Sequence, residues 1–241
     1  ILCPQEDLEE AQSDLGSAVH SILKTKSLPI ILGGGHETAW GHFQGINKFI
    51  PKNKKITLIN IDAHLDLRPL DKKNKGSSGT PYLQIANLCE QEQIIFDYTC
   101  IGLQKSANTT SLFKKAKELN TLIIYSEDLN SIKKSLDLIK EKISNSDFFY
   151  LSICLDAFNM SIAPGVSAPQ ICGLELRQIM PILDLLFASE KLISTDIVEL
   201  SPPHDLNEIT AKLAATLIYR LLLLQKPALS KRLEKINSLK I

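Results

Sequence analysis

The sequence predicts an α/β protein with three layers, in which a mostly parallel sheet lies between two layers of helices. Short apolar runs alternate with stretches of helical periodicity along nearly the whole chain. A helix-length segment separates successive apolar runs, as parallel neighbouring strands require. No internal repeat, low-complexity tract or linker divides the 241 residues. We therefore expect a single domain over residues 1–241.

The elements follow from the spacing of apolar residues. The strands are predicted as short apolar runs at 29–32, 55–61, 94–103, 121–125, 148–155 and 191–198. The helices are predicted where apolar residues recur at intervals of three and four, at 5–25, 37–49, 81–91, 110–119, 128–143, 174–188 and 206–224. Asp128 or Asn130 is a candidate N-cap of the fifth helix, and Asp205 of the last.

Composition excludes several classes of function. Lys and Arg number 27, as do Asp and Glu, so the chain has no basic field that would favour nucleic acid or an acidic membrane. No apolar run approaches the roughly 20 residues of a membrane span. The five cysteines are odd in number and none has CxxC spacing, which favours a reduced, cytoplasmic setting over a disulfide scaffold. A homo-oligomer is compatible with the sequence, which does not set the oligomeric state.

Polar residues follow several of the predicted strands. In open parallel sheets, ligands bind beyond the carboxyl ends of the strands. Strand 29–32 leads into three glycines, His36 and Glu37, and strand 191–198 leads into Glu199. Strand 55–61 leads into Asp62, His64 and Asp66, and strand 148–155 ends around Cys154 and Asp156.

The spacing of Asp62, His64 and Asp66 is the most informative of these features. In an extended segment, alternate side chains share a face, so these three side chains can converge on one point. Carboxylate and imidazole groups are ligands of divalent metals, and His36 and Asp156 would complete such a site. Taken alone, each motif is also compatible with an ordinary turn. Their occurrence together at three strand ends favours a metal site, because burying several acids without a cation is costly.

The motifs resemble those of the ureohydrolase (arginase/agmatinase) superfamily. The matching segments are GGGHETAWG at 33–41, DAHLDLRP at 62–69, GSSGTP at 76–81, SICLDAFNMSIAPGVSAP at 152–169 and DIVELSP at 196–202. The resemblance covers about residues 30–220 and is closest to the formimidoylglutamase family. It implies hydrolysis of N-formimidoyl-L-glutamate to L-glutamate and formamide, a step of histidine breakdown. The alternative within the same chemistry is another ureohydrolase that acts on a guanidino compound.

The resemblance also implies roles for individual residues. It implies two manganese ions, one held by His36, Asp62 and Asp66 and the other by Asp62, His64 and Asp156, with Asp62 bridging. Glu199 occupies the position of a carboxylate that orients the cationic amidinium. Arg68 is a candidate clamp for a substrate carboxylate, because its planar guanidinium matches that group; a surface salt bridge is the alternative.

The sequence departs from the superfamily pattern in three places. Cys154 stands where a bridging carboxylate is expected, so it is either a sulfur ligand, which would favour Zn²⁺ or Co²⁺, or a buried thiol beside a weakened metal site. A weakened site would make the chain a metal-binding protein with little activity. The loop at 76–80 lacks the histidine of arginase itself, which favours the formimidoylglutamase pattern. The segment before residue 29 is short for the family, so we expect the N-terminal part of the domain to be missing.

Overall fold

The computed structural model describes residues 7–237, apart from the side chains of 228–230 and 233. It contains one six-stranded sheet in which every neighbouring pair of strands is parallel. The strands are β1 (Ile30–Leu32), β2 (Ile56–Ile61), β3 (Asp97–Leu103), β4 (Leu122–Tyr125), β5 (Phe148–Cys154) and β6 (Leu192–Val198), in the spatial order β1-β6-β5-β2-β3-β4. The predicted strands and the parallel sheet are confirmed.

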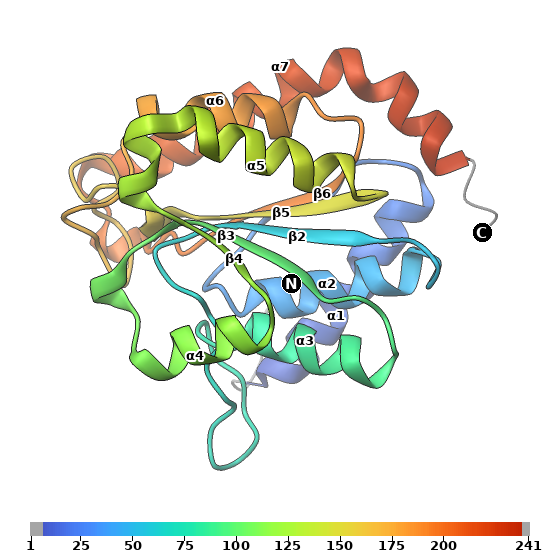
Figure 1. The fold of residues 1–241 in the computed structure, drawn as a ribbon, viewed down its shortest axis with the longest axis horizontal. Helices are drawn as coiled ribbons and strands as arrows, with labels where there is room; N and C mark the ends of the chain where they lie inside the picture. The colour runs from blue at the N-terminus through green and yellow to red at the C-terminus, as the bar shows by residue number, and fades with distance from the viewer. Residues whose placement is uncertain (1–6, 238–241) are drawn as a thin grey trace.

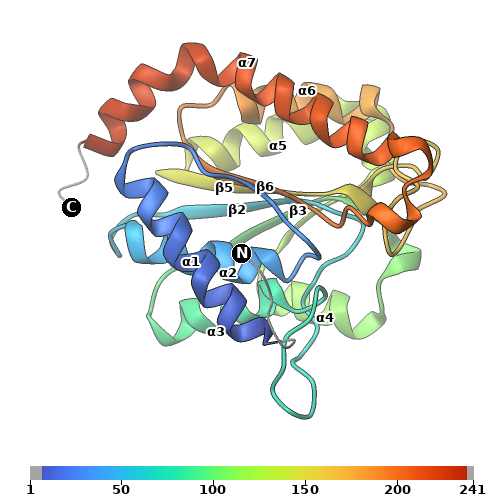
Figure 2. The ribbon, with the colours of Figure 1, turned by 180° about the vertical axis from the view of Figure 1, so that it is seen from behind.

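Helices cover both faces of the sheet (Figures 1 and 2). One layer contains α1 (Leu8–Lys24), α2 (Thr38–Phe49), α3 (Pro81–Gln91) and α4 (Thr110–Glu118). The other layer contains α5 (Ile132–Ser144), α6 (Leu176–Phe187) and α7 (Ile209–Asn237). The predicted three-layer arrangement is therefore confirmed.

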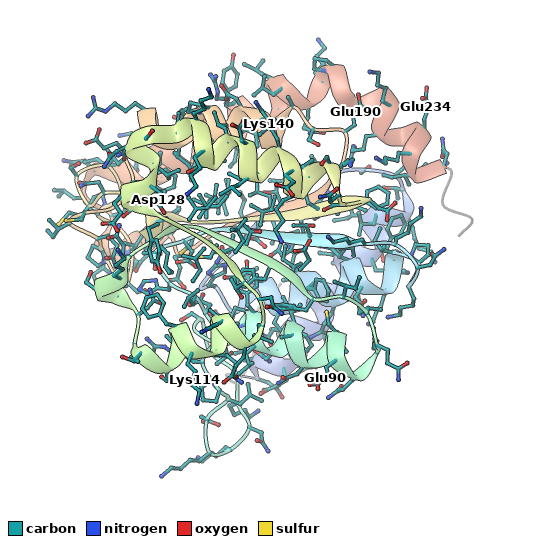
Figure 3. The ribbon with its side chains drawn as sticks, viewed as in Figure 1. Glu90, Lys114, Asp128, Lys140, Glu190 and Glu234 are labelled. Atoms are coloured by element: carbon teal, nitrogen blue, oxygen red, sulfur yellow. The ribbon has the colours of Figure 1, made fainter. Side chains whose placement is uncertain are left out.

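Two apolar cores follow from the alternation of side chains along the strands. Ile59 and Ile61 pack with the layer of α5, α6 and α7, whereas Leu58 packs with the layer of α1 to α4. The outer faces of the helices are charged: Glu90, Lys114 and Lys140 are exposed on α3, α4 and α5 (Figure 3). No helix within 7–237 is both long enough and apolar enough to cross a membrane.

Two helix boundaries differ from the prediction. The fifth helix begins at Ile132, because residues 126–131 form a 3₁₀ turn in which Asp128 accepts a hydrogen bond from the Tyr125 amide. The last helix extends to Asn237, well beyond the predicted end at residue 224. Asp205 does cap it, since its carboxylate accepts hydrogen bonds from the amides of Thr210 and Ala211. Residues 5 and 6 of the first predicted helix lie outside the described residues.

The register of the strands aligns the ends that carry the site. Ile61 of β2 lies beside Ile153 of β5, which lies beside Ile197 of β6, and Leu32 of β1 also lies beside Ile197. The residues that follow these four positions therefore emerge at one edge of the sheet. The loop from β5 to α6, coloured gold, lies at the left of Figure 1 on this edge.

Candidate metal centre

A pocket of about 310 Å³ opens at the carboxyl edge of the sheet. It is lined by all the predicted site residues except Asp62, namely His36, His64, Asp66, Arg68, Cys154, Asp156 and Glu199. Asp62 is fully buried and contacts the histidines that line the pocket. The structure therefore brings the eight predicted site residues together.

The segment with Asp62, His64 and Asp66 is bent, so the expectation that these three side chains share one face of an extended segment is wrong. β2 ends at Ile61, and the Asp62 carboxylate accepts a hydrogen bond from the His64 amide at 2.7 Å, which folds the chain into a turn. Asp66 lies in the left-handed region with φ +49°, a conformation that costs energy for a non-glycine residue. The side chains still converge, but the turn brings them together.

The first group of candidate ligands surrounds His36. Its Nδ1 atom lies 2.8 Å from Asp62 Oδ2 and 2.9 Å from Asp66 Oδ2. This nitrogen is buried and forms no hydrogen bond among the described residues. Cys154 completes a set in which the histidine nitrogen, an Asp62 oxygen and the sulfur all lie within 4.8 Å of one another.

The second group surrounds His64 and shares Asp62 with the first. His64 Nδ1 lies 3.3 Å from Asp62 Oδ1 and 3.2 Å from Asp156 Oδ2. Because one oxygen of Asp62 faces His36 and the other faces His64, this carboxylate stands between two ligand sets. The arrangement could hold two divalent cations with Asp62 shared by both.

Burial and mutual charge perturb the pKa values of these groups strongly. Burial, together with the charge of Asp62, raises the pKa of Asp66 to about 6 and that of Asp156 to about 7. Burial opposes the charged form of His64, but Asp156 and Asp62 outweigh it and raise the pKa of His64 to about 11. Burial also opposes ionisation of Asp62, but both histidines outweigh it and lower its pKa. In the absence of a cation, protons compensate the concentrated negative charge.

A buried hydrogen-bond chain, which no pattern in the sequence predicted, supports His36. Its Nε2 atom lies 2.8 Å from Ser152 Oγ, and Ser152 donates to Asp196 Oδ1 at 2.5 Å. A hydroxyl has one proton, so Ser152 must accept from His36 Nε2–H, which leaves the lone pair of a neutral His36 on Nδ1. Tyr150 and His42 hydrogen-bond to the other oxygen of Asp196. The chain thus orients the Nδ1 lone pair towards Asp62.

Glu199 is held firmly at the rim of the ligand groups. Its Oε1 accepts a hydrogen bond from the His36 amide at 2.7 Å, and its Oε2 accepts one from Ser167 at 2.9 Å. Its backbone has φ +70°, a second strained position in the site. Ser167 was not predicted as a site residue, although it lies within the family-like segment 152–169. Two fixed hydrogen bonds leave the Glu199 carboxylate with a defined orientation.

Arg68 lies at the mouth of the pocket. Its side chain is exposed, lines the pocket and forms no ion pair with any described residue. Arg68 therefore has no partner within residues 7–237 for its alternative role, a surface salt bridge. The nearby loop supplies Ser77 and Ser78 to the same pocket wall.

Comparison with known proteins identifies the family. The model of the arginase family matches residues 1–224. The chain belongs to the arginase family. It is 46% identical to the formimidoylglutamase of Legionella pneumophila strain Paris over 224 residues, which cover 92% of this chain and 69% of the relative. Similarity to the formimidoylglutamase of Clostridium tetani is 38% over 227 residues, covering 91% of this chain and 66% of the relative.

Solved structures of an arginase and a formiminoglutamase have the same fold as this chain. Arginase from Bacillus subtilis superposes with a TM-score of 0.78 at 24% identity, covering 90% of this chain and 80% of that one. Trypanosoma cruzi formiminoglutamase with Mn²⁺ superposes with a TM-score of 0.79 at 21% identity, covering 88% of this chain and 70% of that one. The expected arginase-like fold is therefore confirmed.

Proposed function

We propose that this arginase-family chain is a binuclear metal hydrolase that converts N-formimidoyl-L-glutamate and water to L-glutamate and formamide. The observation that carries the proposal is the position of Asp62, a buried carboxylate shared by two ligand groups at a pocket. Relatives named formimidoylglutamase, at up to 46% identity over most of this chain, support the choice of substrate.

Manganese is the proposed metal, since the structure of Trypanosoma cruzi formiminoglutamase was solved with Mn²⁺. His36, Asp62 and Asp66 would hold one ion, and Asp62, His64 and Asp156 the other. These oxygen and nitrogen donors suit Mn²⁺, and their burial is costly without a cation. Two ions in such a site lower the pKa of a shared water and provide positive charge for the transition state.

The remaining pocket residues would bind and orient the substrate. The carboxylate of Glu199, fixed by the His36 amide and Ser167, would accept hydrogen bonds from the cationic amidine. Arg68, at the mouth and without an ion-pair partner in residues 7–237, would pair with a substrate carboxylate. Binding at both ends would align the amidine carbon with the ligand groups, which lowers the entropic cost of reaction.

A panel of substrates tests the proposal. Manganese-loaded protein is incubated with formimidoylglutamate, arginine and agmatine, while formamide and urea are measured. Formamide from formimidoylglutamate without urea from the others is the expected result. Urea release would show the alternative, a guanidino-compound hydrolase. Metal binding without turnover of any substrate would indicate the alternative in which Cys154 is a buried thiol beside a weakened metal site.

The proposal involves a small-molecule substrate and no nucleic-acid or membrane partner. Cytoplasmic location remains part of it, supported by the four described cysteines, which are all free thiols. A homo-oligomer stays compatible with the proposal.

A further inference from the structure

Cys154 brings sulfur into the group of candidate ligands around His36. It is the last residue of β5, and its side chain is 1% exposed. The Sγ atom, an imidazole nitrogen of His36 and a carboxylate oxygen of Asp62 all lie within 4.8 Å of one another. A single cation could therefore contact all three donors after small side-chain adjustments.

The other described cysteines are placed differently. Cys100 is equally buried and lies under the same bend, but its sulfur contacts backbone carbonyl oxygens, 3.3 Å from that of His64 and 3.7 Å from that of Asp62. Cys89 is buried in an apolar core, and Cys172 is exposed. Among the four, Cys154 alone belongs to a group of three potential ligands.

The hydrogen bond of Cys154 shows where its proton points. The thiol donates to Asp156 Oδ1 at 2.8 Å, towards the second ligand group and not towards His36. A sulfur lone pair can therefore face His36 and Asp62. When a cation binds through sulfur, it replaces the S–H proton, which is released to water.

We propose that the Cys154 thiolate is a ligand of the ion at the His36–Asp62 position, so that the two metal positions differ in chemistry. This inference rests on the proposed binuclear site. The first position then has nitrogen, oxygen and sulfur donors, whereas Asp62, His64 and Asp156 supply only oxygen and nitrogen to the second. Because thiolate favours softer ions, the first position prefers Zn²⁺ or Co²⁺ to Mn²⁺ more strongly than the second does, although both positions bind Mn²⁺ when it is the only metal supplied.

Cobalt binding tests the inference independently of activity. The full chain is freed of metal with a chelator and titrated with Co²⁺, and its absorption spectrum is recorded. Visible d–d bands report bound cobalt, and a near-ultraviolet charge-transfer band reports a cobalt–thiolate bond. We expect both in the wild type. Cys154→Ser loses the near-ultraviolet band and keeps visible bands from the second ion, whereas the matched controls Cys100→Ala and Cys172→Ser keep both.

The outcomes separate this inference from the proposed function. Visible bands without a near-ultraviolet band in the wild type would overturn sulfur ligation and leave the binuclear hydrolase intact. A near-ultraviolet band that persists in Cys154→Ser would assign it to another cysteine and also overturn the inference. No cobalt binding at all would overturn both. As a second variant, Cys154→Asp restores an oxygen donor, and we expect it to shift the first position by at least tenfold towards Mn²⁺ over Co²⁺ in competition titrations.

Discussion

The backbone amide of His36 donates a hydrogen bond to the carboxylate of Glu199 across 2.7 Å, although 163 residues separate the two in the chain. His36 is a candidate metal ligand, and Glu199 is the candidate partner of the amidine. The bond joins the turn after β1 to the strained residue after β6, so the metal and substrate ends of the pocket are positioned together.

Replacing Glu199 with Gln is expected to separate substrate orientation from metal binding. The amide keeps an oxygen that can accept the His36 hydrogen bond but loses the negative charge that faces the amidine. Because hydrogen bonds to charged groups contribute about 1.5–3 kcal/mol, kcat/KM should fall by roughly 10- to 150-fold. Metal content, measured by atomic spectroscopy, should remain that of the wild type. A variant that loses its metal would show that Glu199 supports the metal site.

Ser152→Ala should weaken metal binding although it replaces none of the candidate ligands. It removes the acceptor of His36 Nε2–H and with it the orientation of the Nδ1 lone pair. Loss of such supporting contacts typically costs about 10- to 100-fold in metal affinity. Titration calorimetry measures the effect. The matched control is Ser146→Ala, a buried serine that contacts Thr57 and lies outside the hydrogen-bond chain behind His36. Equal effects in both variants would point to general destabilisation.

Arg68→Ala should raise KM and leave kcat nearly unchanged. An exposed clamp on a remote carboxylate contributes the same binding in the ground state and the transition state. We expect a KM increase of roughly tenfold or more, in line with a lost charge-assisted hydrogen bond. Arg177→Ala is the control, since that arginine is exposed on α6 and pairs with Glu175. An unchanged KM in Arg68→Ala would remove Arg68 from the substrate site.

Metal affinity should rise with pH. The pKa of His64 is about 11, so binding of the second ion must displace its proton throughout the neutral range. The raised pKa values of Asp66, about 6, and Asp156, about 7, add further protons to displace as the pH falls. The affinity for the second ion should therefore drop by about tenfold for each pH unit across the neutral range, and more steeply below about pH 7. Calorimetry in buffers of different ionisation enthalpy counts the released protons. An affinity independent of pH would contradict the protonation pattern.

The strands and most helix boundaries were predictable because apolar periodicity is local. The extension of α7 was not, since Pro227 lies inside it and the continuation is held by Ile236, buried against the opposite core. The candidate ligands were predictable because each follows a strand end. The hydrogen-bond chain behind His36 was not, because Ser152 and Asp196 become neighbours only through the order and register of β5 and β6. No local pattern in the sequence encodes that register.

Paired measurements on the wild type and on Asp62→Asn test whether Asp62 joins two ions into one hydrolytic site. Metal content and formamide release from formimidoylglutamate are measured after loading with manganese. The wild type should bind two ions per chain and release formamide and glutamate in equal amounts, with activity lost on chelation and regained on adding Mn²⁺. Asp62→Asn should lose both ions and all turnover. Formamide release by chelated wild type, or by Asp62→Asn, would show that hydrolysis does not depend on two ions joined by Asp62.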